Sequence, residues 1–289
     1  MNRNIFVNTI PHSGTHLVTA LLDQLDYKHT QLFNRFYSKR PFYRRWQKAG
    51  INWRTSTEIG NYFRYFSDNE IPVSVASPRM AKTGVVINLL SKVKGGEYII
   101  GHVPYSKEGS KVIEQYIAKT ITIIRDPRDM ALSMLNHISA RPAHMAHNYL
   151  SGVLLTDSER LEAVVNGYKN QYGSLAGLSN MYRSMLLWKK ECNNITLKFE
   201  DLVGAKGGGR NDVQFNAIKT IIEHIELPNE ITDENIVNIG LESFGKSSTF
   251  RKGKIGRWRS AFNVEDKKVC KQSINDLLIE LNYESSNEW

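Results

Sequence analysis

Five short apolar, β-branched runs recur along the chain, and each is bounded by turn-forming residues. Runs of this kind are typical of strands whose two faces are both buried, as in a parallel sheet. Segments with helical spacing of apolar residues separate them, and alternating strands and helices favour an α/β fold with a mainly parallel sheet. The runs are IFVNTI (5–10), PVSVAS (72–77), EYIIGHV (97–103), TITIIRD (120–126) and NITLKFE (194–200).

The helical segments place apolar residues on one side at intervals of three and four. No internal repeat and no linker divides the chain, so we predict one domain over residues 1–289, with a central sheet flanked by helices. The expected helices are Thr15–Leu25, Arg128–Ser139, Asn180–Glu191, Phe215–Ile225 and Val264–Leu281.

The net charge of +9 predicts an anionic ligand or an anionic surface among the partners. Cys192 and Cys270 are the only cysteines, which is typical of a reducing compartment rather than of a disulfide framework. The N-terminal sequence MNRNIFVNTI has no apolar stretch of signal-peptide or membrane-span length, so we expect a cytoplasmic location.

The sequence IPHSGTH joins the first predicted strand directly to the first predicted helix. Unpaired backbone amides and the positive dipole end of a helix start make an anion site that suits a phosphate. Gly14 allows close approach of the backbone, and the hydroxyls of Ser13 and Thr15 are possible donors. The same hydroxyls would serve equally as ordinary helix caps, so this motif does not by itself identify a site.

Two further segments concentrate cations where a phosphate could bind. In TITIIRDPRDMALSML, Arg125 ends a strand and Ser133 lies on the second turn of the helix that follows Pro127. In FRKGKIGRWRSAF, Arg251, Lys252, Arg257 and Arg259 surround Gly253 and Gly256, either as a loop that wraps a phosphate or as a solvated or nucleic-acid-binding face.

Taken in order, the three segments resemble the sulfotransferases that use 3′-phosphoadenosine 5′-phosphosulfate (PAPS). That family has a P-K-S-G-T-T-W loop, matched by Pro11–Leu17, and an R-[DN]-P-[KR]-D-x-x-x-S segment, matched from Arg125 to Ser133. Its R-K-G-x-x-G-x-W-[KR] loop is matched by residues 251–259. Order and spacing agree from residue 5 to about residue 262. The resemblance implies a P-loop-NTPase-like sulfotransferase fold.

The resemblance also implies a reaction and a set of site residues. A sulfuryl group would pass from PAPS to an acceptor hydroxyl or amine, releasing adenosine 3′,5′-bisphosphate (PAP), without a metal. His102, in the family's K-x-H-L-P position, would be the general base, and a neutral imidazole suits proton removal near pH 7. The nucleotide would contact His12, Ser13, Gly14, Thr15, His16, Arg125, Ser133, Phe199, Ser243, Phe244, Arg251, Lys252 and Gly253.

The chain departs from the family pattern at His12, which occupies the position of the loop lysine. We interpret His12 as a second catalytic residue, because a histidine can donate a hydrogen bond, or act as a cation if nearby phosphates raise its pKa. Its reach is shorter than that of lysine, and His16 and Lys82 are the other candidates for a compensating group. Leu17 replaces the family's tryptophan and weakens the expected aromatic sandwich on the adenine.

Two further segments and a group of histidines lie outside the three motifs. Residues 33–54 alternate basic and aromatic side chains and fit a peripheral membrane contact, an acceptor lid or a solvated helix face. GAKGGGRND at 204–212 is predicted to be a mobile surface loop. His137, His144 and His147 suggest a metal site by spacing, but no cysteine or clear carboxylate completes it, so we assign them to the surface or the acceptor pocket.

The acceptor pocket is expected in segments 28–95 and 137–190, whose composition permits a small molecule, a glycan, a lipid or a peptide. No nucleic-acid partner is expected, and the oligomeric state is not predicted. Two alternatives remain at this stage: a P-loop-type nucleotide kinase, and a basic protein that binds nucleic acid or a membrane surface.

Overall fold

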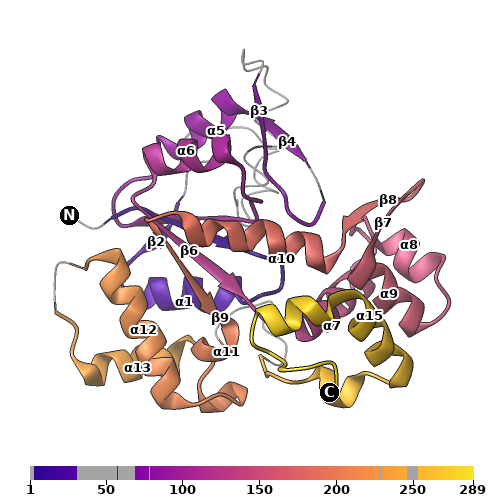
Figure 1. The fold of residues 1–289 in the computed structure, drawn as a ribbon. Helices are drawn as coiled ribbons and strands as arrows, with labels where there is room; N and C mark the ends of the chain where they lie inside the picture. Colours follow the sequence, from indigo (N-terminus) through magenta and orange to yellow (C-terminus); the bar gives the residue numbers. More distant parts are fainter. Residues whose placement is uncertain (1–2, 31–56, 58–68, 78, 228–229, 246–252) are drawn as a thin grey trace.

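The structure is a computed structural model that describes residues 3–30, 57, 69–77, 79–227, 230–245 and 253–289. A five-stranded sheet at its centre has the order β2-β5-β1-β6-β9, and every neighbouring pair is parallel. This confirms the predicted α/β class with a parallel sheet flanked by helices (Figure 1). The strands are β1 (Ile5–Thr9), β2 (Lys28–His29), β5 (Glu97–Gly101), β6 (Lys119–Ile124) and β9 (Asn194–Lys198).

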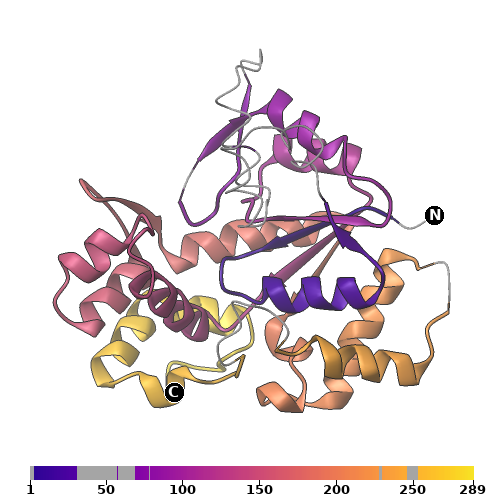
Figure 2. The same ribbon diagram turned by 180° about the vertical axis from the view of Figure 1, so that it is seen from behind.

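Strand β1 shows why the apolar runs become strands of a sheet covered on both faces. Ile5 and Val7 belong to one apolar cluster, whereas Phe6 between them belongs to the other. The first cluster includes α1 (Thr15–Gln24), α12 (Asn211–Ile225) and α13 (Asp233–Ser243), and the second includes α5 (Thr83–Leu90), α6 (Lys107–Tyr116) and α10 (Leu178–Leu186). The two groups of helices lie on opposite sides of the sheet (Figures 1 and 2).

The run at 72–77 does not form a strand of the central sheet, so that prediction is wrong. It follows β3 (Glu70–Pro72), which pairs antiparallel with β4 (Met80–Lys82) in a separate hairpin. Ser74 makes one isolated parallel bridge to His102, and the Val75 N–H donates to the His102 carbonyl at 2.8 Å. The run therefore lies beside the segment that follows β5 and supports the backbone of His102.

The predicted helices form close to their expected bounds. The segment 128–139 is α7 (Pro127–Ser139), 180–191 is α10 with a following 3-10 turn (Leu187–Lys190), and 264–281 is α15 (Val264–Glu280). Beyond the sheet, a second group of elements, which includes α7 and α15, packs together (Figure 1). Its remaining elements are α8 (His147–Gly152), α9 (Asp157–Asn166), β7 (Gly167–Asn170), β8 (Gly173–Ala176) and α14 (Trp258–Ala261).

Segment 204–212, expected to be a mobile loop, contains a 3-10 turn (Ala205–Gly207) that packs against the C-terminal loop. The Ile255 N–H donates to the Gly207 carbonyl at 3.0 Å, and a side chain at position 207 would lie 2.9 Å from the Gly253 carbonyl. No helix among the residues with described placement is long and apolar enough to cross a lipid bilayer.

Asn8 joins β1 to the segment that follows β5. Its fully buried amide donates to the Val103 carbonyl at 3.1 Å and accepts from the Val103 N–H at 2.8 Å. The Trp188 indole donates to the same carbonyl at 3.0 Å. An alanine at position 8 would therefore leave chiefly one buried N–H, that of Val103, without an acceptor.

We predict that Asn8→Ala lowers the free energy of unfolding by about 2 kcal/mol, the cost of an orphaned buried donor. Urea unfolding followed by circular dichroism measures this difference. The matched control is Asn216→Ala on the exposed side of α12, which should stay within about 0.5 kcal/mol of the wild type. Equal stability of the two variants would contradict the proposed contribution of the Asn8–Val103 hydrogen bonds to stability.

Candidate active site

Four segments that carry predicted site residues meet at the carboxyl ends of adjacent strands. The loop 10–14 follows β1, His102 follows β5, Arg125 follows β6 and Phe199 follows β9. The strands β2 and β5 lie on one side of β1, and the strands β6 and β9, which come later in the sequence, lie on its other side. Open α/β sheets bind ligands at such a switch point, outside the carboxyl ends of the strands.

The loop after β1 is held by its own serine and by close packing of its glycine. The Ser13 hydroxyl is buried and donates to the carbonyls of Ile10 (2.7 Å) and Ile123 (3.0 Å), so it ties the loop to β6. Gly14 has a φ of 116°, and a Cβ there would lie 2.5 Å from the Phe199 ring. Only glycine satisfies both demands, because it has no Cβ and tolerates positive φ.

The first turn of α1 has unsatisfied donors. It has no side-chain cap and no acidic residue. Within the described part of the chain, the backbone N–H groups of Gly14, Thr15 and His16 donate to no protein acceptor. Three such amides at the positive end of a ten-residue helix attract an anion. The backbone at the start of α1 therefore has three donors without protein acceptors in the described structure, whereas the Ser13 hydroxyl bonds within its own loop and to β6.

Arg125 connects the loop after β1 to the C-terminal loop. Arg125 as a whole residue is only 6% exposed, and its Nη1 and Nη2 donate to the carbonyls of His12 (3.4 Å) and Lys254 (3.0 Å). The guanidinium also lies 4.3 Å from the centre of the Phe199 ring and 3.8 Å from the Asp129 carboxylate. Its buried Nε donates to no acceptor among the described residues, so it retains a donor for an anionic ligand.

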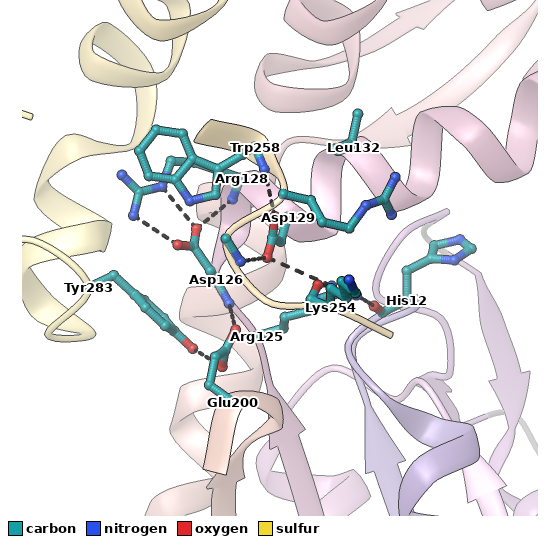
Figure 3. Close-up of polar contacts among 12 residues, drawn as sticks. His12, Arg125, Asp126, Arg128, Asp129, Leu132, Glu200, Lys254, Trp258 and Tyr283 are labelled. Carbon is teal, nitrogen blue, oxygen red and sulfur yellow. Dashed lines mark hydrogen bonds and ion pairs between the residues drawn. The ribbon is translucent and has the colours of Figure 1, made fainter. Parts of the chain in front are cut away.

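Arg128, the other arginine of this segment, has a structural role. It is fully buried, donates to both oxygens of Asp126 (3.0 and 2.8 Å) and forms an ion pair with Glu284. Its guanidinium lies over the rings of Trp258 (3.7 Å) and Trp289 (4.5 Å). Figure 3 shows the Arg128 contacts with Asp126 and Trp258. The C-terminal tail thus packs against the start of α7.

The carboxylate of Asp129 holds the C-terminal loop in place. It accepts hydrogen bonds from the Gly256 N–H (2.7 Å) and the Trp258 N–H (2.9 Å). Figure 3 shows Asp129 beside Trp258. Burial raises the pKa of Asp129, while Arg125 and the two amides favour its ionised form. Gly253 begins the described part of this loop with a φ of 55°. Two predicted nucleotide contacts, Arg251 and Lys252, lie outside the described residues.

Glu200 supports the start of α7 from below. Its two oxygens accept from the Asp126 N–H (2.9 Å) and the Tyr283 hydroxyl (2.8 Å), and burial raises its pKa (Figure 3). The segment 199–201 therefore contributes a buried support through Glu200 as well as the ring of Phe199.

The other predicted nucleotide contacts lie on α7 and at the end of α13. Ser133 is partly buried on α7. The Ser243 hydroxyl is buried and donates to the Ile239 carbonyl at 2.7 Å, as a helix-end contact. Phe244 packs against the apolar cluster that contains Phe199. Ser133 stays a prediction as a direct ligand, as do Ser243 and Phe244.

His102 is oriented by the last residue of β1. Its Nδ1 lies 2.7 Å from the Thr9 carbonyl and 3.2 Å from the Thr9 hydroxyl. Because a carbonyl only accepts, Nδ1 must carry the hydrogen, and the lone pair of the neutral ring lies on Nε2. This is the tautomer that a general base needs. No sequence pattern singled out Thr9, because it lies within the apolar run 5–10 and belongs to no charged motif.

Three histidine rings form a contact series beside the loop. The rings of His12 and His137 lie 4.6 Å apart edge to face, and those of His137 and His144 lie 5.7 Å apart. The Nη1 of Arg141 is 2.9 Å from the His137 Nε2. His147 instead bonds through Nδ1 with the Ile138 carbonyl. In the chain segments described, no group of three histidine, cysteine or acidic side chains could hold a metal ion.

The surroundings of His12 favour its neutral form. Burial lowers its pKa well below the usual 6.5, and the neighbouring His137, His102, His144 and Arg125 lower it further. Its φ of 70° is in the left-handed region, which costs a non-glycine residue energy and is found chiefly at functional sites. In the protein without nucleotide, the loop therefore presents a neutral donor where the family pattern has a lysine.

Comparison with known proteins identifies the family. Residues 2–281 match the family described as "Sulfotransferase domain". The chain therefore belongs to the sulfotransferase domain family, which confirms the resemblance seen in its motifs. Comparison with curated protein sequences gives no significant match.

Solved structures of similar fold include a sulfotransferase and a retinol dehydratase, each in complex with PAP. Mouse sulfotransferase SULT7A1 in complex with PAP has a TM-score of 0.59 and 15% identity, with coverage of 97% of this chain and 85% of that one. Retinol dehydratase with androsterone and PAP has a TM-score of 0.53 and 17% identity over 95% and 80% of the two chains. A second retinol dehydratase complex, with retinol and PAP, has a TM-score of 0.51 and 16% identity over 95% and 81%.

We predict that the His12 ring stays neutral well below pH 6.5 in the protein without nucleotide, because burial and nearby cationic groups disfavour its charged form. Nitrogen-15 NMR of the imidazole across pH 7 to 5 measures its titration. In the unfolded chain the ring gains its proton near pH 6.5, so His12 should reduce stability as pH falls through this range.

His12→Gln provides the linked test, because glutamine cannot titrate. The fall in melting temperature between pH 7 and pH 5 should be smaller in this variant than in the wild type. A His12 resonance that titrates at or above pH 6.5, or an unchanged pH dependence in the variant, would show that the ring is not desolvated.

Proposed function

We propose that this protein transfers a sulfuryl group from PAPS to an acceptor hydroxyl or amine and releases PAP. The observation that carries the proposal is the pairing of two anion-binding features, on a chain of the sulfotransferase domain family. One is the uncapped start of α1, and the other is the buried guanidinium of Arg125. The family match favours this function over the nucleotide kinase and over a general anionic-surface-binding protein.

The described residues fit the two ends of PAPS. We assign the phosphosulfate to the amides of Gly14, Thr15 and His16, whose donors lack protein acceptors in the described structure. The 3′-phosphate is assigned to Arg125, whose Nε has a donor to spare, together with Ser133 and residues 251–253. Phe199, Ser243 and Phe244 are proposed to border the adenine. No metal ligand is required by this arrangement.

The proposed chemistry is an in-line displacement at sulfur. His102 accepts the acceptor's proton at Nε2 while the acceptor oxygen or nitrogen bonds to sulfur, and the bond from sulfur to the bridging oxygen breaks. Both electrons of that bond remain on the 5′-phosphate. The amides at the start of α1 and the Thr15 hydroxyl donate hydrogen bonds to the charge that develops there, an arrangement worth about 10²-fold or more in rate per donor.

His12 is proposed to act in the same step as a hydrogen-bond donor. Its neutral ring offers less charge than a lysine, but it needs no counter-ion in a partly buried place. Arg125, which donates to the His12 carbonyl, brings a permanent positive charge to this part of the loop. The phosphosulfate would itself favour the charged form of His12 on binding.

The acceptor is proposed to be a small molecule with a hydroxyl group. Androsterone and retinol are bound in the two retinol dehydratase structures of similar fold. The segments assigned to the pocket, 28–95 and 137–190, include the described hairpin of β3 and β4 and the histidines 137 and 144. The proposed peripheral membrane segment, 33–54, lies outside the described residues.

Nucleotide preference tests the assignment. We predict that PAP raises the melting temperature by several degrees at 1 mM, whereas ATP, which lacks the 3′-phosphate, gives a much smaller shift. Differential scanning fluorimetry with both nucleotides measures the difference, and adenosine 5′-monophosphate serves as the matched ligand that differs from PAP only by the missing 3′-phosphate. Equal stabilisation by PAP and ATP would contradict the proposed site.

The role of His102 is tested by substitution. His102→Ala should reduce sulfuryl transfer from radiolabelled PAPS by about 10²-fold or more, the usual effect of a general base, and should leave PAP affinity within a few-fold of wild type. The control is His224→Ala, because the His224 ring bonds to the Thr120 carbonyl near the opposite end of β6. Transfer at the wild-type rate in His102→Ala would refute the base assignment.

A further inference from the structure

Thr9 lies between the proposed base and the proposed phosphate site. It is the last residue of β1 and is fully buried. Its hydroxyl oxygen is 2.6 Å from the Thr15 hydroxyl and 3.2 Å from the Nδ1 of His102. Thr15 is the first residue of α1, where the unpaired amides lie. A single side chain therefore contacts both functional groups.

The direction of these hydrogen bonds follows from donor counting. His102 Nδ1 carries a hydrogen because it lies 2.7 Å from the Thr9 carbonyl, which only accepts. The Thr9 hydroxyl cannot donate to this N–H and lies at 3.2 Å as its second, weaker acceptor, so we assign the hydroxyl's own hydrogen to Thr15. The Thr15 hydroxyl receives this hydrogen, so its own hydrogen remains to be donated to another acceptor.

We propose that Thr9 is a positioning residue that couples His102 to the phosphosulfate site through one directed hydrogen-bond chain, from His102 Nδ1 to Thr9 to Thr15 to the bound anion. This inference rests on the proposed function. It assigns Thr9 a role in the reaction although its side chain touches neither the acceptor nor the nucleotide.

The chain links the two charges that appear during transfer. As Nε2 of His102 takes the acceptor's proton, the ring becomes a cation and a stronger donor at Nδ1. Hydrogen bonds in series polarise one another, so the Thr9 and Thr15 hydroxyls also become stronger donors. The strengthened Thr15 donor faces the 5′-phosphate, where negative charge grows as the sulfur–oxygen bond breaks. Thr9 moves no proton between groups; it orients and polarises.

A purely structural Thr9 would give different results. In that case its hydroxyl would only satisfy buried neighbours, and its loss would lower stability without changing how His102 responds to nucleotide. Thr9→Val separates the two roles, because valine keeps the shape and suits a buried strand but removes the hydroxyl. The His102 bond to the Thr9 carbonyl remains, so the ring keeps its tautomer.

The experiment compares wild type, Thr9→Val, Thr9→Ser and the control Thr120→Val. Thr120 is a buried threonine on β6 whose hydroxyl has no partner among the described residues. The first readout is nitrogen-15 NMR of His102 with and without saturating PAP, which needs no turnover. We expect PAP to shift the Nδ1 resonance in wild type, Thr9→Ser and Thr120→Val, but not in Thr9→Val.

The second readout is the pH profile of kcat. Thr9→Val should lower kcat about tenfold, the worth of one hydrogen bond to a charged group. Loss of an acceptor makes the imidazolium less stable, so the acidic limb of the profile should move to lower pH. Thr9→Ser should restore both. If Thr9→Val does not fold, Thr15→Val at saturating PAP should abolish the same His102 shift.

The outcomes separate this inference from the function on which it rests. Wild-type protein that neither binds PAP nor transfers label would refute the proposed function. If wild type does both, a PAP-induced His102 shift that persists in Thr9→Val, or a serine variant that restores nothing, would refute the coupling role of Thr9.

Discussion

The buried carboxylates at the start of α7 are the interactions on which the site depends. Asp126 holds the guanidinium of Arg128, and Asp129 holds two amides of the C-terminal loop. Glu200, which follows β9, accepts a hydrogen bond from the Asp126 N–H and so fixes the backbone at the start of α7. Buried charges are stable only when they are paired and hydrogen-bonded, so each carboxylate requires its partner to be in position. The loops around Arg125 are therefore fixed relative to the sheet by charge satisfaction.

The central architecture follows from the sequence because buried parallel strands and amphipathic helices have distinct apolar patterns. The run 72–77 has the composition of a strand, but its first residue, Pro72, pairs in the β3–β4 hairpin, and Ser74 makes one isolated bridge to His102. Composition alone cannot distinguish a strand of the sheet from an extended segment beside it. The glycines at 204–209 suggested mobility, yet their lack of side chains permits close packing against residues 253–255.

Glycine and charge marked Gly14 and Arg125 in the sequence, and the family resemblance marked His102; all three lie at the carboxyl ends of adjacent strands. The separate roles of the residues within one motif could not be predicted from the sequence. The Ser13 hydroxyl ties its loop to β6, and the Arg128 guanidinium lies against the rings of Trp258 and Trp289. Thr9 carries no signal in the sequence, since a threonine that ends a buried strand is common. Its hydrogen bonds depend on where β1 and the segment after β5 meet.

The partners of α7 lie far from it in the sequence. Asp129 bonds to residues 127 and 129 positions later, and Arg128 pairs with a carboxylate 156 positions later. Contacts of such large separation form slowly, because a long loop must close before they contribute. A chain emerging from the ribosome can complete β1, β5 and β6 while these charges still lack their partners. The nucleotide site is therefore expected to mature late in folding, when the C-terminal third packs against α7.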